Sequence, residues 1–253
     1  MTTLNRNYVL APFHNLISNC QNNVLMGLRI IEKVDTFPGP TPEELQFFQL
    51  SFGGPVTGLE QSKVPFKKWI LVNGFEDVCK SITATLERLL IFRTIESTIK
   101  KNKKFNIEES ERELRLKVTR LDFPELIARV NSLFEEKLQY QKEVESFRKA
   151  RNCLEHAHGT VAKRDCNNPE KDKLIIHGNR FRLFFKKDEA EVLAEFGKAG
   201  PENAALMLGA EEFQIEFPLG QSIELSLKQF IDILNTCVFI RVDIELKLKE
   251  SSG

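Results

Sequence analysis

The segment RNCLEHAHG, residues 151–159, brings together side chains that can do acid–base and anion-binding chemistry. The imidazole of His156 titrates near neutral pH and can accept or donate a proton. The guanidinium of Arg151 can bind an anion such as phosphate through two parallel hydrogen bonds. Asn152 precedes His156 by one helical turn and can orient it. We therefore take Arg151, Asn152 and His156 as the candidate catalytic residues.

The expected helix around Arg151 also predicts its neighbours. At about 100° per residue, Arg151 falls at the border of the apolar stripe marked by Phe147 and Leu154, and His156 faces away from that stripe. A guanidinium beside a core needs an acceptor. Glu155, four residues further on, is the local ion-pair partner that the sequence offers.

Two other interpretations of this segment remain open. Asn, His and Gly are common at helix C-termini, where a cationic histidine suits the negative end of the helix dipole, so the segment can be an ordinary helix end. Cys153, His156 and His158 also offer ligand types for zinc, with Cys166 and His177 downstream. No paired ligand motif completes that set, and we expect neither a metal nor a cofactor.

The elements that must position the segment are mainly helical. Apolar residues recur at steps of three and four along most of the chain before Gly159. The predicted helices follow Pro12, start at Thr41, span 66–101, start after Asn106 and after Asp122, and span 138–158. Asn106 and Asp122 are typical N-caps, and Gly159 is a typical helix stop.

Residues after Gly159 predict a small β element. LIIH and RFRLFF flank Gly178-Asn179, and FQIEF and SIELS flank Pro218-Leu-Gly220, so two hairpins are expected. Residues 187–211 predict one poor helix or an excursion. Ser226 caps a final helix, which we expect to continue through 240–248 although apolar and charged residues alternate there. The fold class is mainly α with a small β element.

The arrangement of Arg151, Asn152 and His156 at a helix end before Gly159 resembles the signature of the HEPN-domain family (higher eukaryotes and prokaryotes nucleotide-binding). The surrounding helices resemble HEPN proteins of toxin–antitoxin and abortive-infection systems, and this similarity covers about residues 66–160. It implies an antiparallel helical core at 66–160. Outside the segment that carries the resemblance, we expect residues 1–65 to form an N-terminal helical extension and residues 161–253 to pack on the core as one domain.

The resemblance implies a metal-independent endoribonuclease that cleaves single-stranded RNA. Ribose carries its own nucleophile, the 2′-hydroxyl, so cleavage needs proton transfers and charge stabilisation. Separate acid and base roles favour two histidines, and we expect a homodimer in which two copies of 151–156 face one cleft. An antitoxin or a nucleotidyltransferase is a further implied partner. HEPN-like modules also serve as non-catalytic scaffolds or nucleotide-binding partners, which is the alternative function.

Composition limits which partners and which cellular location we expect for the protein. The chain has 36 basic and 36 acidic residues, so a globally basic nucleic-acid binder is excluded. A local contact with RNA through His158, Lys100, Lys101, Lys103 and Lys104 stays open beside the simpler interpretation of a solvated helix end. Five widely spaced cysteines, no signal peptide and no apolar span predict a soluble cytoplasmic protein that does not bind a membrane.

Overall fold

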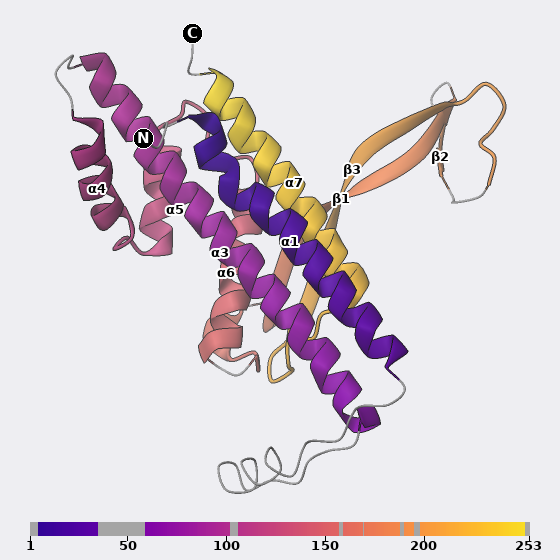
Figure 1. Ribbon diagram of the computed structural model, residues 1–253. Helices are drawn as coiled ribbons and strands as arrows, with labels where there is room; N and C mark the ends of the chain where they lie inside the picture. The colour runs from indigo at the N-terminus through magenta and orange to yellow at the C-terminus, as the bar shows by residue number, and fades with distance from the viewer. Residues whose placement is uncertain are drawn as a thin grey trace, which may run out of the picture.

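The computed structural model describes residues 5–34, 59–101, 106–156, 159–168, 170–187, 190–194 and 198–250. Within them the protein is mainly α with one small antiparallel sheet, which confirms the predicted fold class (Figure 1). The elements are α1 (Arg6–Lys33), α3 (Leu59–Lys101), α4 (Ile107–Val118), α5 (Phe123–Asn131), α6 (Gln141–His156), the short 3₁₀ helix η1 (Lys163–Asp165), β1 (Lys173–Lys187), β2 (Ala190–Leu193), β3 (Ala205–Pro218) and α7 (Leu227–Glu250).

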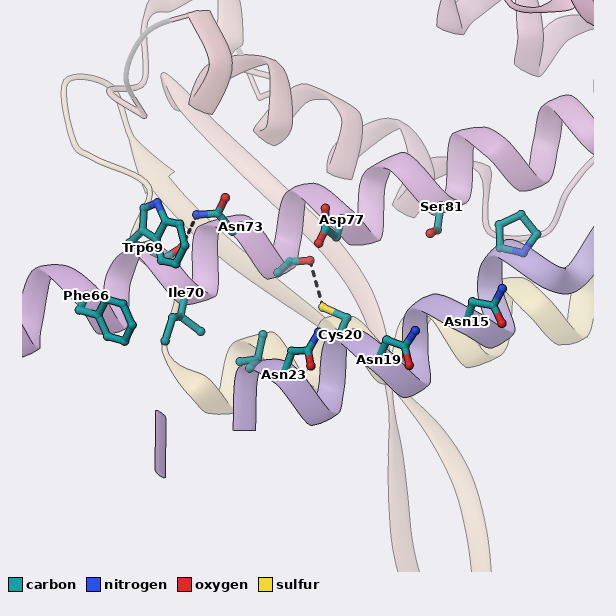
Figure 2. Close-up of a pocket in the computed structure, with 13 residues that line it drawn as sticks. Asn15, Asn19, Cys20, Asn23, Phe66, Trp69, Ile70, Asn73, Asp77 and Ser81 are labelled. Carbon is teal, nitrogen blue, oxygen red and sulfur yellow. Dashed lines mark hydrogen bonds between the residues drawn. The ribbon is translucent and has the colours of Figure 1, made fainter. Parts of the chain in front are cut away.

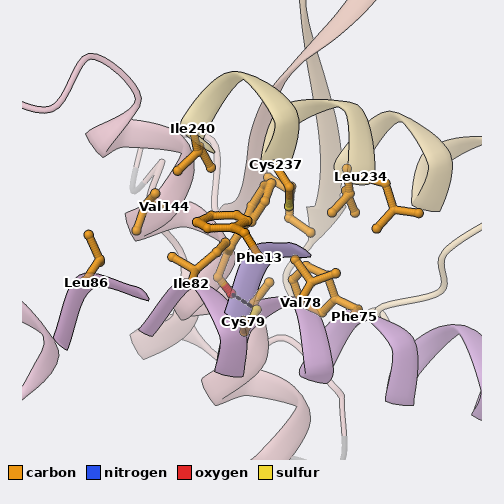
Figure 3. Close-up of a cluster of buried hydrophobic side chains, with 14 of the residues drawn as sticks. Phe13, Phe75, Val78, Cys79, Ile82, Leu86, Val144, Leu234, Cys237 and Ile240 are labelled. Atoms are coloured by element: carbon orange, nitrogen blue, oxygen red, sulfur yellow. Dashed lines mark hydrogen bonds between the residues drawn. The ribbon is translucent and has the colours of Figure 1, made fainter. Parts of the chain in front are cut away.

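Helix α3 forms the axis of the structure. The helices α1, α5, α6 and α7 all contact it, and α1 runs antiparallel to it along much of its length (Figure 1). Phe13 of α1, Phe75 of α3 and Phe147 of α6 are fully buried, and the rings of Phe75 and Phe147 meet edge to face at 5.9 Å (Figure 3). The core therefore lies where three helices from distant parts of the chain converge.

Gly74 marks the tightest point of this packing. A Cβ atom there would lie 2.8 Å from Val24 of α1 and 2.9 Å from the ring of Phe230 of α7. A glycine inside a long helix costs about 1 kcal/mol in helix propensity relative to alanine. Here the missing side chain allows both neighbouring helices to approach α3.

The local signals for helix ends are confirmed. Asn106 accepts a hydrogen bond from the backbone N–H of Glu109, and Asp122 accepts one from that of Glu125. Gly159 has a φ of 77° and its N–H bonds to the carbonyl of Cys153 at 3.2 Å, as in a helix stop that uses the left-handed region. The helix predicted to start at Thr41 lies outside the described residues.

The continuous final helix is confirmed as well. Ile240, Ile244 and Leu248 are buried in α7, whereas Val242 and Leu246 are about half exposed. The apolar residues that matter for burial are thus spaced by four. The sequence shows a strand-like alternation because the exposed apolar residues Val242 and Leu246 lie between the buried ones.

The sheet has the order β2-β1-β3, with β1 antiparallel to both neighbours. The first half of β1 lies among the helices: the backbone N–H of His177 bonds to Ser146 of α6 at 3.0 Å, and that of Asn179 bonds to Thr236 of α7 at 2.9 Å. The second half of β1, with β2 and the start of β3, projects away from the helices (Figure 1). We call residues 181–187, 190–193 and 205–210 the arm.

The predicted turn at Gly178-Asn179 is wrong, because β1 runs straight through it. Gly178 serves close packing instead: a Cβ atom there would lie 2.3 Å from the ring of Phe213 and 2.6 Å from the hydroxyl of Thr236. Glycine is therefore required at this position by close packing with residues distant along the chain, and the sequence alone cannot distinguish this requirement from that of a tight turn.

The second predicted hairpin and the helix option for 187–211 are also wrong. The segment SIELS forms no strand; Ser222 makes an isolated bridge with Thr160, and the N–H of Gly220 bonds to the carbonyl of Val161. The chain after β3 thus pairs with the segment that follows α6. Within 187–211 the described residues hold β2 and the start of β3, whose exposed side chains leave no burial pattern for the sequence to display.

Replacing Gly178 by alanine should destabilise the fold by about 1–3 kcal/mol, because the added methyl group meets Phe213 and Thr236 in a packed region. Urea unfolding followed by circular dichroism measures the change. Gly209→Ala is the matched control, since this strand glycine faces only the partly exposed ring of Phe184, and less than about 1 kcal/mol is expected. Equal losses in the two variants would contradict the packing role of Gly178.

Candidate functional site

Residues 151–156 form the last turns of α6, which is held between α3 and the first half of β1. Val144, Phe147, Ala150 and Cys153 are the buried side chains that fix the rotation of this helix. Their spacing of three residues places Arg151 at the edge of the buried face. The predicted border position of Arg151 is confirmed, since its side chain is 17% exposed.

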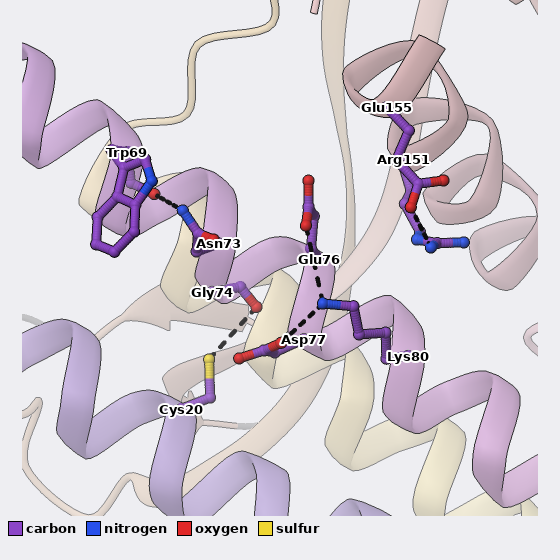
Figure 4. A network of polar contacts seen from close by, with 9 residues as sticks. All are labelled: Cys20, Trp69, Asn73, Gly74, Glu76, Asp77, Lys80, Arg151 and Glu155. Atoms are coloured by element: carbon purple, nitrogen blue, oxygen red, sulfur yellow. Dashed lines mark hydrogen bonds and ion pairs between the residues drawn. The ribbon is translucent and has the colours of Figure 1, made fainter. Parts of the chain in front are cut away.

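Arg151 and Glu155 form the ion pair that the sequence predicted. Figure 4 shows the pair facing the stretch of α3 that carries Glu76 and Lys80. Burial raises the pKa of the Cys79 thiol on α3, and the positive charge of Arg151 lowers it in part. The Nε atom of Arg151 is buried and has no hydrogen-bond partner among the described residues. One donor of Arg151 therefore remains unused inside the structure.

His156 is the final residue of α6 and is exposed, whereas Asn152 is half-buried one turn before it. The described residues show no hydrogen bond that joins Arg151, Asn152 and His156 to one another. The helix therefore carries all three groups at one end, with Arg151 directed to α3 and His156 open to solvent. A ligand that used both side chains would span the edge of the helix.

Of the residues that the sequence suggested as additional RNA contacts, the structure describes the side chain of Lys100 alone. Lys100 is exposed and lies 4.0 Å from Glu96 on the same helix, as expected for a solvated helix end. The side chains of Lys101, Lys103 and Lys104, and the whole of His158, lie outside the described residues.

The geometry does not favour the zinc interpretation. Cys153 is fully buried beside Asp165, and burial together with the Asp165 charge raises the pKa of its thiol to about 11. His156 is exposed, while burial lowers the pKa of His177 with help from the Lys142 charge. Among the described residues no group of three potential ligands lies close enough to hold a metal ion.

A groove between α1 and α3 is the feature that the sequence analysis missed. It has a volume of about 530 Å³, and Asn15, Asn19 and Asn23 line one wall at one-turn spacing (Figure 2). Asn73 and Asp77 face them from α3. The repeat of asparagine at i, i+4 and i+8 was the available signal, because amides rarely line one helix face that is destined for a core.

One end of this groove is aromatic. The rings of Phe66 and Trp69 stack with centroids 5.8 Å apart, and these residues are 41% and 60% exposed. Amide groups donate and accept hydrogen bonds, and an exposed indole offers a flat surface for stacking. Lys80 links the groove to the motif side of α3, since it lies 3.3 Å from Asp77 and 3.8 Å from Glu76 (Figure 4).

Comparison of the chain with protein-family models, with curated proteins and with solved structures finds no match. No helix in the described part of the chain is long and apolar enough to cross a membrane.

All five cysteines are buried free thiols, and we expect none to react in the folded protein. Burial raises the pKa of Cys20 to about 11 and raises those of Cys79 and Cys237 as well, so at pH 8 these thiols stay protonated and shielded. Iodoacetamide followed by intact-mass spectrometry should show no label on the native protein and full labelling in denaturant. His156→Cys, which introduces an exposed thiol, should add one label to the folded protein. Fast labelling of the folded wild type would contradict the burial of these thiols.

Proposed function

We propose that the protein is a metal-independent endoribonuclease of the HEPN type that acts on single-stranded RNA in the cytoplasm. The observation that supports this most directly is the placement of an exposed His156 five residues after the anchored guanidinium of Arg151 at the end of α6. An exposed imidazole can reach a substrate proton, and a guanidinium that is already held in place can bind a phosphate that displaces Glu155.

The reaction needs only groups that the chain and the RNA supply. The 2′-hydroxyl loses its proton to an imidazole and attacks the adjacent phosphorus, while the bond to the 5′-oxygen breaks and that oxygen gains a proton. Arg151 stabilises the negative charge that builds on the non-bridging oxygens. The products are a 2′,3′-cyclic phosphate and a 5′-hydroxyl. Asn152 orients His156 or a phosphate oxygen.

Two proton transfers favour two imidazoles, and α6 itself carries one, His156. A second copy that places its own 151–156 segment across the same cleft supplies the other. His156 is the last residue of α6 and is exposed, so a second copy would approach it from the solvent side. Within a toxin or defence system, an antitoxin or a nucleotidyltransferase would be the partner that restrains or modifies this site.

The groove between α1 and α3 supports an unpaired rather than a duplex substrate. Unpaired bases can stack on Trp69 and Phe66 and present their edges to the amides of Asn19, Asn23 and Asn73, whereas bases inside a duplex cannot. The groove and Arg151 lie on adjoining sides of α3, so one strand of RNA can contact both.

A non-catalytic helical scaffold is the second candidate, and the ion pair between Arg151 and Glu155 favours it. In that case the guanidinium serves only to tie the end of α6 together beside α3. His156 would then be an ordinary residue at a helix C-terminus, where the dipole stabilises positive charge.

Purified protein should cleave single-stranded RNA in the presence of EDTA and leave 2′,3′-cyclic phosphate ends. His156→Ala should reduce the rate by about 10²–10⁴-fold if it transfers a proton, with little loss of RNA binding. Arg151→Ala should also slow cleavage, and Asn152→Ala should do so less. Gel analysis of end-labelled RNA measures the rates.

His14→Ala is the matched control, because His14 is an exposed histidine on another helix. Circular-dichroism melts must show that each variant folds like wild type. Cleavage only with magnesium, or full activity of His156→Ala, would reject the proposed mechanism.

Glu155→Gln separates the two candidate functions. If Arg151 binds phosphate, removing the competing carboxylate should raise RNA affinity about fivefold, the equivalent of about 1 kcal/mol for a partly exposed pair. Fluorescence anisotropy with a labelled oligonucleotide measures this. Glu145→Gln, at an exposed position on the same helix, controls for net charge. Lower stability with unchanged RNA affinity would favour the scaffold.

A further inference from the structure

The arm carries an apolar face that the helices cover only at its base, where the ring of Phe181 lies 4.7 Å from that of Phe239 of α7. Residues directly opposite each other in an antiparallel sheet lie on the same face. The register of β1 with β3 and β2 therefore puts these residues on one face: Phe181 with Ala210, Leu183 with Leu208, and Phe185 with Leu206 and Val192. Leu183, Leu206 and Leu208 are 49%, 59% and 61% exposed, although they are among the largest aliphatic side chains of the sheet.

The opposite face of the arm is built differently. Arg182 pairs with Glu191 across strands at 3.1 Å and lies over the ring of Phe184, and Arg180 at the base pairs with Glu211. Met207 and the β2 residue Leu193 are exposed there, but they are interleaved with these charges. The arm thus has one ion-paired face and one face without a charge between residues 181 and 185.

The charges that bound the apolar face are opposite in sign. Glu212, which lies opposite Asn179, is at the base of the arm, and Lys187 is at its tip; both are exposed and both share the apolar face. Residues 179 and 187 are each four positions from Leu183 along β1. The apolar face therefore has charged residues at equal distances on either side of Leu183, and these two charges are opposite in sign.

We propose that this face binds the same face of a second copy of the chain. Two arms related by a two-fold axis through the Leu183–Leu208 pair run antiparallel, so the tip of each arm meets the base of the other. Lys187 of one copy then lies opposite Glu212 of its partner, twice in the dimer, while the leucines pack between them. A two-fold contact requires such a self-complementary patch.

The size of the face sets the strength of the contact. Among the described residues this face exposes five large apolar side chains, Phe181, Leu183, Val192, Leu206 and Leu208, so the contact is small, and interfaces below about 1,200 Å² in total are typical of weak association. We therefore expect a reversible dimer that forms at micromolar concentrations. The end of α6 lies near the other end of β1, where Thr160 pairs with Ser222, so this contact is separate from any that joins two 151–156 segments.

Sedimentation velocity of the full chain between about 1 and 100 µM tests the proposal, and wild type should shift from monomer to dimer over that range. Leu183→Glu should weaken dimer formation at least tenfold, because it buries a charge at the symmetry axis. Met207→Glu is the matched control on the opposite face of the same sheet and should leave the dimer unchanged. Far-ultraviolet circular dichroism checks that both variants keep the fold.

Charge reversal tests the antiparallel arrangement. Lys187→Glu should weaken the dimer by setting two carboxylates against each other, and adding Glu212→Lys in the same chain should restore it. A wild type that stays monomeric, or a Leu183→Glu variant that dimerises like wild type, would overturn the proposal. Binding of a monomeric wild type to phosphatidylcholine–phosphatidylglycerol vesicles through Leu183 would also overturn it, in favour of a lipid surface.

Discussion

The close approach of α1 and α7 to α3 at Gly74 is the constraint on which the remaining architecture depends. Val24 and Phe230 occupy the space that any larger side chain would need. With α7 held at that distance, Thr236 reaches β1, where its hydroxyl accepts from the N–H of Asn179 and donates to the carbonyl of the same residue. The sheet is therefore positioned through α7, and the packing at Gly74 determines where the arm projects from the helices.

The same packing determines what Arg151 can do. Phe147 must meet Phe75, so α6 cannot rotate, and the residue four positions further along is carried to the edge of α3. Removing a guanidinium from water is unfavourable unless acceptors replace the lost hydrogen bonds. Glu155 supplies one, and the buried Nε of Arg151 lacks a protein partner among the described residues. The helix thus holds a cation whose hydrogen bonding is incomplete.

The sequence predicted those features that depend on neighbours along the chain. The caps at Asn106 and Asp122, the stop at Gly159 and the pair of Arg151 with Glu155 involve residues at most six apart, so their spacing reveals them. Gly178 is different, because Phe213 and Thr236 are distant in sequence and only the folded chain brings them to it.

The candidate site divides in the same way. The location of Arg151, Asn152 and His156 at a helix end followed from periodicity, but the groove between α1 and α3 did not. Its two walls come from helices about fifty residues apart, and neither wall is distinctive until the other faces it. The three asparagines of α1 were visible as a repeat. Their meaning depends on Trp69 and Asn73, which the sequence places in a different helix.

The electrostatics of the site bear on how the proposed RNA substrate would be recruited. The chain has no net charge, and Glu155 neutralises the guanidinium of Arg151 in the free protein. Long-range attraction of an RNA backbone is therefore weak at this end of the molecule. Breaking a partly exposed ion pair costs only about 1 kcal/mol, which a bidentate phosphate contact can offset. In the proposed reaction Arg151 would become available only when a phosphate is already close, so stacking and amide contacts would have to provide the earlier steps of recognition.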